Sequence, residues 1–477
     1  MSDSLTDRSA LELSALVASG EVSCVEVVAA HLDRVAALEP LLHALVSRVP
    51  EDEVFEEASR RDAALLAGAP SGWLHGLPHA VKDLADLRGL PTSLGLFDPA
   101  STPPAREDES FVGRIRRAGA VFIGKTNTSE LGVGSHTYNQ IAPTTANVVS
   151  PAVSAGGSSG GAAVAVAAGY VPVADGSDFM GSLRNPPGWN GVLGLRPSPG
   201  VVLDRGESRT DPGFGVSGPI ARTSADLRAL LQTMAEPGTN LGGGTSLASV
   251  PPRVGWLDAL CEALPFEDGV LDTCRRAAAR WTDQLVSLTG TEDGVLSREL
   301  LWQAWLVIRH DAVGGWVSAA FSEAEISAMK PEVQWEVEGF RGLSDDERRR
   351  GYAAVGDIRR AVGALFDEVD LLMLPTAQVW PFASELASPT SVGGVDMDTY
   401  HRWMEVTALA TLAGLPTAAV PAGRDGAGRH IGLQVVGPPG GDAQVLDWVA
   451  WAEQRELFGV TPPSRSVAAP GTAMPGA

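Results

Sequence analysis

Apolar positions recur with the helical period at the start of the chain. Their spacing predicts a first helix that Asp7 caps and Gly20 ends, and a second helix that opens on the capping box of Ser23 and Glu26. The N-terminal region is therefore predicted to be helical. The same periodicity predicts later helices at about 110–118, 162–168, 222–235 and 442–456.

The pattern changes from Leu77 onward, where short apolar runs rich in β-branched residues alternate with Gly and Pro. Runs of this length between turn-forming residues are typical of buried strands. Because a helical pattern separates the first two runs, the strand–helix–strand order predicts a sheet of the α/β class. Strands are predicted at about 78–82, 120–124, 370–375, 417–421 and 430–437.

These patterns divide the chain into consecutive regions. The middle of the chain is rich in charge, Trp and helical periodicity, which predicts a helical insertion or cap over the sheet. The final stretch is rich in Pro, Ala, Gly and Ser, which predicts a mobile tail. The predicted regions are N-terminal helices at 1–65, the core at 66–225, the insertion at 226–369, the C-terminal strands and helix at 370–460, and the tail at 461–477.

The composition argues against several classes of partner. With 36 basic and 58 acidic residues the net charge is −22, which disfavours nucleic acid and anionic membranes. The longest apolar run, 162–173, is shorter than the ~20 residues that a spanning helix needs, and the N-terminus lacks a signal-peptide pattern. We therefore expect a cytoplasmic protein, a monomer or homodimer, whose partners are a small molecule and water.

Cysteine and lysine are both rare. The cysteines lie far apart without the spacing of a metal site, so we expect a reducing compartment, no metal and no cofactor. Nearly all positive side chains are Arg, and since Arg cannot lose its proton, a retained Lys is a candidate base. The cysteines are Cys24, Cys261 and Cys274, and the lysines are Lys82, Lys125 and Lys330.

The sharpest motif is the loop Gly156–Gly161, in which glycines flank the paired serines Ser158 and Ser159. Glycine permits close approach of the backbone to a ligand, and the Ala-rich helix that follows directs its N-terminal amides at the loop. The loop lacks the Lys of a P-loop and the glycine offsets of a dinucleotide fingerprint. It fits the bare G-x-S-x-G elbow of Ser–His–Asp hydrolases, but it lacks the preceding strand, and the nearby histidines all precede it.

Two further features complete the candidate chemistry. Ser182 follows Ser158 by 24 residues, which leaves room for one helix and one strand that return the chain to the glycine loop. The amides just before Ser182 can face a developing oxyanion. Lys82 ends an apolar strand, where burial would lower its pKa toward use as a base.

Together these motifs resemble the amidase signature family, over most of the chain. The family implies a single large α/β/α sandwich with a central mixed, mostly parallel, twisted β-sheet and a helical insertion. It also implies an amidohydrolase without a cofactor or metal, here similar to aryl acylamidase-like and urethanase-like members. The anchors are Gly76–Asp83, Gly119–Asn127, Gly156–Gly161, Asp178–Arg184, Leu412–Pro421 and Ile431–Gly437.

The resemblance implies a Ser–cis-Ser–Lys triad in this chain. It makes Ser182 the nucleophile, Ser158 the bridging serine with a cis peptide bond, and Lys82 the base. The implied oxyanion hole consists of the amides of Phe179, Met180, Gly181 and Ser182. The implied supporting residues are Ser159, Ser177, Asp178 and Arg184.

The chain departs from the family at Met180, where a glycine is usual. A Met side chain there narrows the acyl pocket and makes it apolar. The divergent insertion carries four tryptophans that either form an aromatic wall of the pocket or belong to the core. These are Trp302, Trp305, Trp316 and Trp335. The substrate-binding candidates are Gly132, Val133, Trp302 and Trp305.

The predicted function is hydrolysis of a small apolar, aryl-bearing amide or carbamate through an acyl-enzyme on Ser182. Two alternatives stay open: the glutaminase subunit of a tRNA-dependent amidotransferase, and a hydrolase of lactams or cyclic amides. The first would bind glutamine through charged contacts and work beside a tRNA-binding partner. A non-catalytic binding protein is disfavoured because Lys82, Ser158 and Ser182 are all present.

Overall fold

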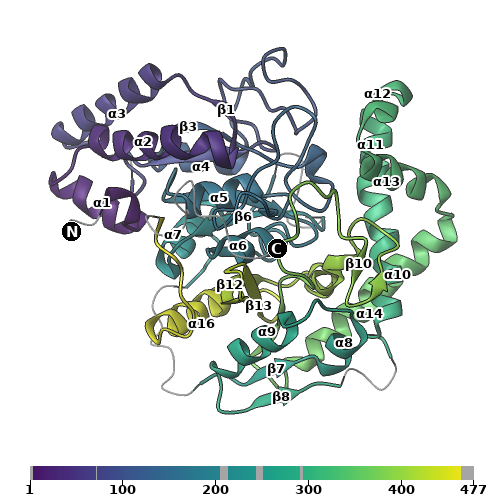
Figure 1. Cartoon of the computed structure of the whole chain (residues 1–477). Coiled ribbons are helices and arrows are strands. Elements are labelled where there is room, and N and C mark those ends of the chain that lie inside the picture. The colour runs from purple at the N-terminus through teal and green to yellow at the C-terminus, as the bar shows by residue number, and fades with distance from the viewer. Residues whose placement is uncertain (1–3, 71, 205–212, 243–250, 290–293, 464–477) are drawn as a thin grey trace.

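In the computed structural model of the chain, an eight-stranded sheet forms the central layer and is flanked by helices (Figure 1). The structure describes residues 4–70, 72–204, 213–242, 251–289 and 294–463. The strands are β1 Leu45–Arg48, β2 Pro78–Lys82, β3 Val121–Thr126, β4 Val173–Asp178, β5 Leu193–Arg196, β6 Val216–Ala221, β7 Val254–Trp256, β8 Leu285–Ser287, β9 Leu371–Pro375, β10 Ser391–Val392, β11 Val395–Asp396, β12 Thr417–Arg424 and β13 His430–Val436.

Helices pack against these strands (Figure 1). The α-helices are α1 Ala10–Ser19, α2 Cys24–Leu42, α3 Glu51–Leu66, α4 Ser110–Arg117, α5 Gly160–Ala167, α6 Asn185–Asn190, α7 Ser224–Met234, α8 Asp258–Ala263, α9 Val270–Ala279, α10 Arg298–Arg309, α11 Gly315–Ala320, α12 Glu323–Ala328, α13 Pro331–Gly342, α14 Asp345–Leu365, α15 Ala408–Ala413 and α16 Asp442–Gln454. Short helical segments are η1 Leu5–Asp7, η2 Glu130–Gly132, η3 His310–Gly314 and η4 Arg402–Thr407.

The large sheet has the order β4-β6-β5-β12-β13-β9-β7-β8. Its mixed character matches the prediction, but the expectation of a mostly parallel sheet is wrong for the described residues, where five of seven strand pairs are antiparallel. Strand β6 separates β4 from β5, although these two run in the same direction. The short loop between β12 and β13 permits only an antiparallel pair. A strand–helix–strand rhythm therefore did not reveal which strands are neighbours.

A smaller sheet of order β1-β3-β2 lies beside the large one. Strands β2 and β3 are parallel, buried along their whole length and separated in sequence by α4, as the patterning predicted. The two sheets meet where the backbone amide of Lys82 donates to the Asp175 carboxylate on β4, at 3.0 Å. This contact fixes the end of β2 against the large sheet.

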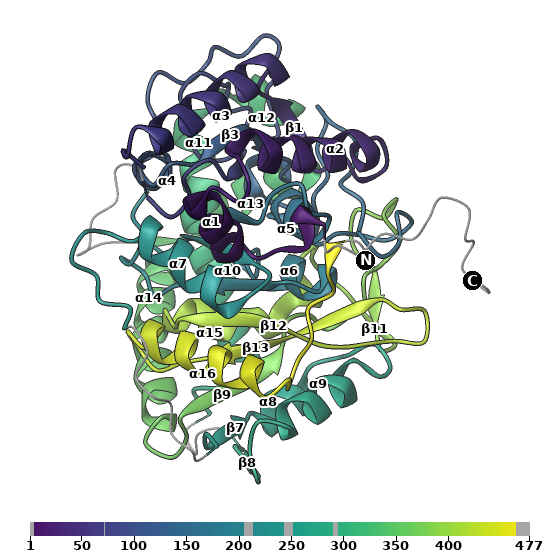
Figure 2. The same ribbon diagram turned by 90° about the vertical axis from the view of Figure 1, so that its left-hand side faces the viewer.

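The N-terminal helices gather at one end of the molecule, opposite to β7 and β8 (Figure 2). The capping box of Ser23 and Glu26 opens α2 as predicted. The cap of α1 is Ser9 rather than Asp7, because Ser9 forms a full capping box with Glu12 while Asp7 belongs to η1. Helix α5 is buried at every position, which its Ala and Val side chains allow.

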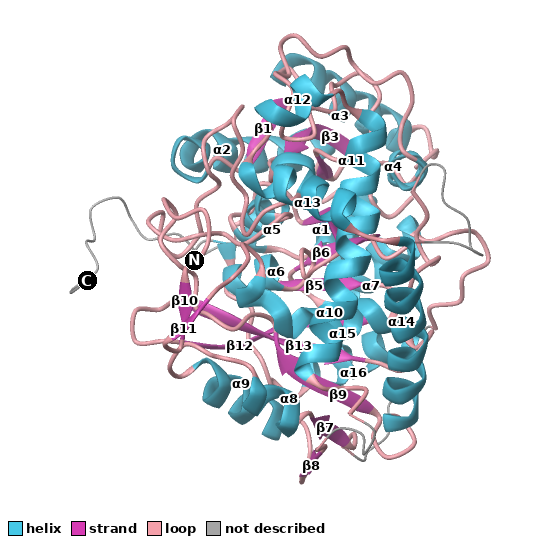
Figure 3. Cartoon of the chain, turned by 90° about the vertical axis from the view of Figure 1, so that its right-hand side faces the viewer, coloured by secondary structure: helices cyan, strands magenta, loops and turns pink. Residues whose placement is uncertain are grey.

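The divergent middle of the chain contributes both strands and helices. Strands β7 and β8 extend the large sheet beyond β9, and α10 to α14 stand together on one side of the molecule (Figure 3). The cap helices α11 to α13 share a hydrophobic cluster with Leu131 and Val133, so they are packed on the segment around η2. Of the predicted tail, 464–477 lie outside the described residues. No helix in the described ranges has the length and apolarity needed to cross a membrane.

Candidate active site

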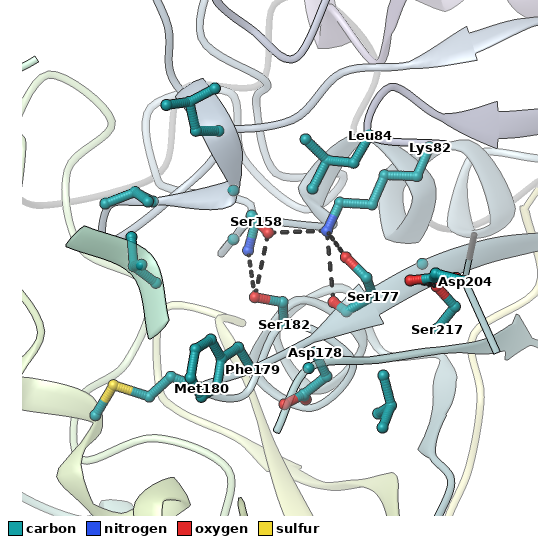
Figure 4. Close-up of a pocket in the computed structure, with 18 of the residues that line it drawn as sticks. Lys82, Leu84, Ser158, Ser177, Asp178, Phe179, Met180, Ser182, Asp204 and Ser217 are labelled. Carbon is teal, nitrogen blue, oxygen red and sulfur yellow. Dashed lines mark hydrogen bonds between the residues drawn. The ribbon is translucent and has the colours of Figure 1, made fainter. Parts of the chain in front are cut away.

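Lys82 occupies the centre of a cluster of serines. It is the last residue of β2 and its side chain is 1% exposed. Its Nζ lies 2.8 Å from Ser158 Oγ and 2.9 Å from Ser177 Oγ (Figure 4). It also lies 2.8 Å from Ser159 Oγ. Three hydroxyls, two from the glycine loop and one from strand β4, therefore converge on one amine.

Burial changes the protonation of this amine. Desolvation lowers the pKa of Lys82 to about 7, against the opposing effect of nearby carboxylates, of which Asp178 is the strongest. No carboxylate forms an ion pair with Nζ among the described residues. A large share of the molecules therefore holds Lys82 as a neutral amine at neutral pH.

Ser158 links this amine to Ser182. The Gly157–Ser158 peptide bond is cis, as the resemblance implied. The Ser158 amide donates to Ser182 Oγ at 2.9 Å, and the two Oγ atoms lie 3.3 Å apart. Lys82, Ser158 and Ser182 thus form one continuous chain of contacts.

The glycines of the loop are required by close packing. A Cβ on Gly157 would lie 2.7 Å from the His136 backbone, and a Cβ on Gly161 would lie 2.5 Å from the Asn127 backbone. Thr137 accepts from the Gly160 amide at 2.9 Å and fastens the start of α5. A side chain at Gly157 or Gly161 would therefore displace Ser158 from its position between Lys82 and Ser182.

A buried ion cluster holds the loop of Ser182. Asp178 lies 2.8 Å from Arg184 Nη2 and 3.3 Å from Arg196 Nη1, all three being buried. Although burial opposes it, these two arginines keep the pKa of Asp178 well below its usual range. The carboxylate also accepts from the Gly181 and Leu183 amides, at 2.9 Å each, on both sides of Ser182.

The same cluster alters the implied oxyanion hole. The Gly181 amide is already used by Asp178, so the structure does not offer it to a substrate. Among the described residues, the amides of Phe179, Met180 and Ser182 have no hydrogen-bond acceptor. These three remain candidates for stabilising an oxyanion.

Ser182 and Lys82 open into a cavity of about 620 Å³. Gly132 and Val133, the predicted substrate-binding candidates, line this cavity, and a Cβ on Gly132 would lie 3.6 Å from Ser158 Oγ. Much of the wall is apolar, from Leu84, Phe111, Leu131, Phe179, Met180, Val313, Trp316 and Met404. Charged or polar groups also line it, notably Glu109, Asp204, Arg309, Tyr400 and His401.

The tryptophans divide between wall and core. Trp316 lines the cavity. Trp302 and Trp305 do not, which corrects their assignment as substrate-binding residues; both are buried behind His401, and Trp305 also packs edge-on against Phe179 at 5.5 Å. Their large apolar surfaces are used to fix the residues that do face the cavity.

Sequence reasoning missed Arg309, Tyr400 and His401. They follow Ser182 distantly in the chain and belong to segments without a motif, so no spacing connects them with the serines. The one available signal was the Arg309–Asp311 run of charged side chains within an apolar helical pattern. No group of His, Cys, Asp and Glu in the described part of the chain could hold a metal ion.

Comparisons with known proteins show which family the chain resembles along its length. The family model for amidases matches residues 26–250 and 311–446. The chain is 32% identical to a glutamyl-tRNA(Gln) amidotransferase subunit from Chromohalobacter salexigens, over 92% of this chain and 95% of that one. It is 31% identical to an acylamidase of Rhodococcus erythropolis, over 94% and 96%. A bacterial aryl acylamidase of the amidase signature family has a similar structure, with a TM-score of 0.81, 25% identity and coverage of 94% and 96%. The family-wide match, and the near full-length relatives, establish that this chain is a member of the amidase family.

Proposed function

We propose that this amidase hydrolyses a small, apolar, aryl-bearing amide or carbamate through an acyl-enzyme on Ser182. The observation that carries the proposal is the unbroken contact chain from Lys82 through Ser158 to Ser182 at the wall of the cavity. The chemistry follows from the hydrogen-bonding capacity of each member.

Neutral Lys82 has two N–H donors and one lone pair. The Ser159 hydroxyl donates to the Ser177 carbonyl at 3.1 Å, so its oxygen is left to accept from Nζ. A second N–H is directed to Ser177 Oγ at 2.9 Å. The lone pair is then free to accept the proton of Ser158.

Proton transfer makes Ser182 nucleophilic. Ser158 passes its proton to Lys82 and takes the proton of Ser182, whose Oγ attacks the carbonyl carbon. The Ser158 amide, 2.9 Å from Ser182 Oγ, stabilises the charge that develops there. The proton then returns through Ser158 to the leaving nitrogen, the C–N bond breaks, and water releases the acyl group by the same relay.

The apolar wall supports the aryl preference. Phe179, Met180 and Trp316 face the cavity and offer flat or flexible apolar surface to a ring. Burial stabilises an apolar group by roughly 25 cal/mol per Å², so one phenyl ring contributes a few kcal/mol of binding. Carbamates fit the same chemistry: when their C–N bond breaks, the amine leaves with the relayed proton and Ser182 carries an alkoxycarbonyl group instead of an acyl group, which water then releases.

A second candidate is the glutaminase subunit of a tRNA-dependent amidotransferase. The amidotransferase relative from Chromohalobacter salexigens covers nearly the whole chain. The cavity also contains Glu109, Asp204 and Arg309, charges that a zwitterionic amino acid could use. The ratio of kcat/KM for aryl amides to that for glutamine separates the two candidates.

The test combines turnover with covalent trapping. An activated O-aryl carbamate is a trapping probe, because Ser182 Oγ can expel its phenoxide, with C–O cleavage, and keep the carbamoyl group. This adduct should be visible by intact mass spectrometry, and Ser182→Ala should abolish both the adduct and the turnover of amides. Ser198→Ala is the matched control, because Ser198 is buried but lies outside the cavity. An adduct that persists in Ser182→Ala, or a kcat/KM for glutamine above that for anilides, would contradict the proposal.

A further inference from the structure

Arg309 is a buried cation that the proton relay does not use. It ends α10, is 5% exposed and lines the cavity. Its guanidinium carbon lies 5.0 Å from the centre of the Phe179 ring. Phe179 is three residues before Ser182 and supplies one of the candidate oxyanion amides, so Arg309 stands about one aromatic ring away from the reacting group.

Only part of the guanidinium is engaged by the protein. Its Nε donates to Glu336 at 3.0 Å, and its Nη2 donates to Tyr400 Oη at 3.3 Å. Nη1 has no hydrogen-bond acceptor among the described residues. A guanidinium has five N–H donors, so several remain for a bound molecule.

The surroundings of Arg309 already neutralise its charge. Although burial opposes it, Arg309 lowers the pKa of Glu336 to about 2, so Glu336 is ionised. His310 and Tyr400 also bond Glu336, at 2.9 and 2.5 Å. Burial lowers the pKa of His401 to about 3, which leaves that neighbour neutral. A second carboxylate beside this pair would share one cation with Glu336 in a buried site, which is costly.

We propose that Arg309 is the specificity-determining residue of this cavity, binding a neutral hydrogen-bond acceptor of the substrate, such as a carbonyl or ether oxygen, one ring beyond the scissile group. The inference rests on the proposed function and deepens it by naming the substrate class. A guanidinium donating to a neutral acceptor gains a charge-assisted hydrogen bond without bringing in a further charge. An aryl amide with such a group should therefore be selected over one that lacks it.

The probes are para-substituted benzanilides in two series, with the substituent on the acyl ring or on the aniline ring. Each series contains acetyl, isopropyl and carboxylate; acetyl and isopropyl have similar shapes, but only acetyl accepts a hydrogen bond. In one series, the wild-type kcat/KM should favour acetyl over isopropyl by about 10- to 100-fold, the range of a hydrogen bond to a charged group. Acetyl and carboxylate both accept hydrogen bonds, and of these two the carboxylate should give the lower kcat/KM.

The variant Arg309→Met/Glu336→Gln removes the ion pair together, so no buried charge is left alone. It should reduce the acetyl-to-isopropyl ratio to about one, and Arg309→Lys should reduce it in part, because Lys lacks the planar fork. Arg402→Met is the matched control. Like Arg309, Arg402 stacks on an aromatic ring, that of Trp302, and pairs with a buried glutamate, Glu405. Unlike Arg309, it does not line the cavity.

Two outcomes would overturn the inference: equal acetyl and isopropyl values in both series, or a preference that survives in the double variant. A higher kcat/KM for the carboxylate than for the acetyl compound would overturn the claim that Arg309 selects a neutral acceptor. Calorimetry on Ser182→Ala protein measures the same ratios as binding constants without turnover. If no benzanilide is hydrolysed by the wild type, the proposed function fails, while the binding ratios in Ser182→Ala and its Arg309 variants still decide the role of Arg309.

Discussion

Replacement of Lys82 by Met should stabilise the protein at neutral pH and abolish its activity. The folded chain lowers the pKa of Lys82 to about 7 through burial, from an ordinary value of 10.5. Between these values the unfolded chain binds a proton that the folded chain does not. Stability therefore rises with pH in this window, by about 1.4 kcal/mol per pH unit, and the full cost of the buried lysine is present below pH 7.

The size of the effect follows from the two values. Lowering the pKa of Lys82 from 10.5 to about 7 costs the folded protein about 5 kcal/mol at low pH. This cost is the upper limit of the stabilisation that Lys82→Met provides. The variant also loses hydrogen bonds to three serines, worth about 1 kcal/mol each, which offsets part of the gain at every pH. The free energy of unfolding of Lys82→Met minus that of the wild type therefore tests the reasoning best through its change with pH, not through its absolute value.

Urea unfolding of both proteins between pH 6.5 and 9 tests this reasoning. The stability difference between Lys82→Met and wild type should fall by about 2 kcal/mol from pH 7 to pH 9. Ser158→Ala is the control, because it removes the relay but keeps the titrating amine, so its pH dependence should match the wild type. A difference that does not vary with pH in this range would show that Lys82 is not neutral in the folded protein.

Three further predictions concern the same site. The kcat/KM for an anilide should rise through pH 7 and then level off, since Lys82 must be neutral to accept a proton, and a maximum below pH 6 would exclude it as the base. Dialysis against a chelator should leave activity unchanged; a loss that a divalent cation restores would refute metal independence. Trp305→Ala should cost about 3–5 kcal/mol in unfolding free energy, because the ring is fully buried, and a marginal cost would mean that the ring is not core.

Local patterns predicted much of the secondary structure. The strands β2, β3, β9 and β13 and the helix α16 lie where short apolar runs and helical periodicity placed them. Pairing was not predictable in this way, because an apolar run shows that a strand is buried and says nothing about its neighbour. The insertion of β6 between β4 and β5 depends on contacts between distant segments.

The site shows the same division. Ser158 and Ser182 were recognisable because glycines and small residues mark a loop whose backbone must pack closely. Arg309 carries no such mark: it is the last residue of the amphipathic helix α10, and only the packing of that helix beside Phe179 turns it toward the cavity. Trp305 illustrates the converse error, since a large aromatic residue near a site fits core and wall equally well until its neighbours are known.

The three lysines of the chain share burial but differ in what their amines contact. All three are buried, with Lys82 at 1%, Lys125 at 0% and Lys330 at 4% exposure. Lys125 Nζ lies 3.1 Å from Asp83, and Lys330 Nζ lies 3.7 Å from the Tyr138 ring centre and would be 2.9 Å from a Cβ on Gly134. Lys82 differs from both in its partners: serine hydroxyls meet its amine, whereas Asp83 pairs with Lys125 and the backbone carbonyls of Val133 and Tyr138 accept from Lys330. Composition therefore singled out three positions, and the partners of each amine separate the proposed base from two structural cations.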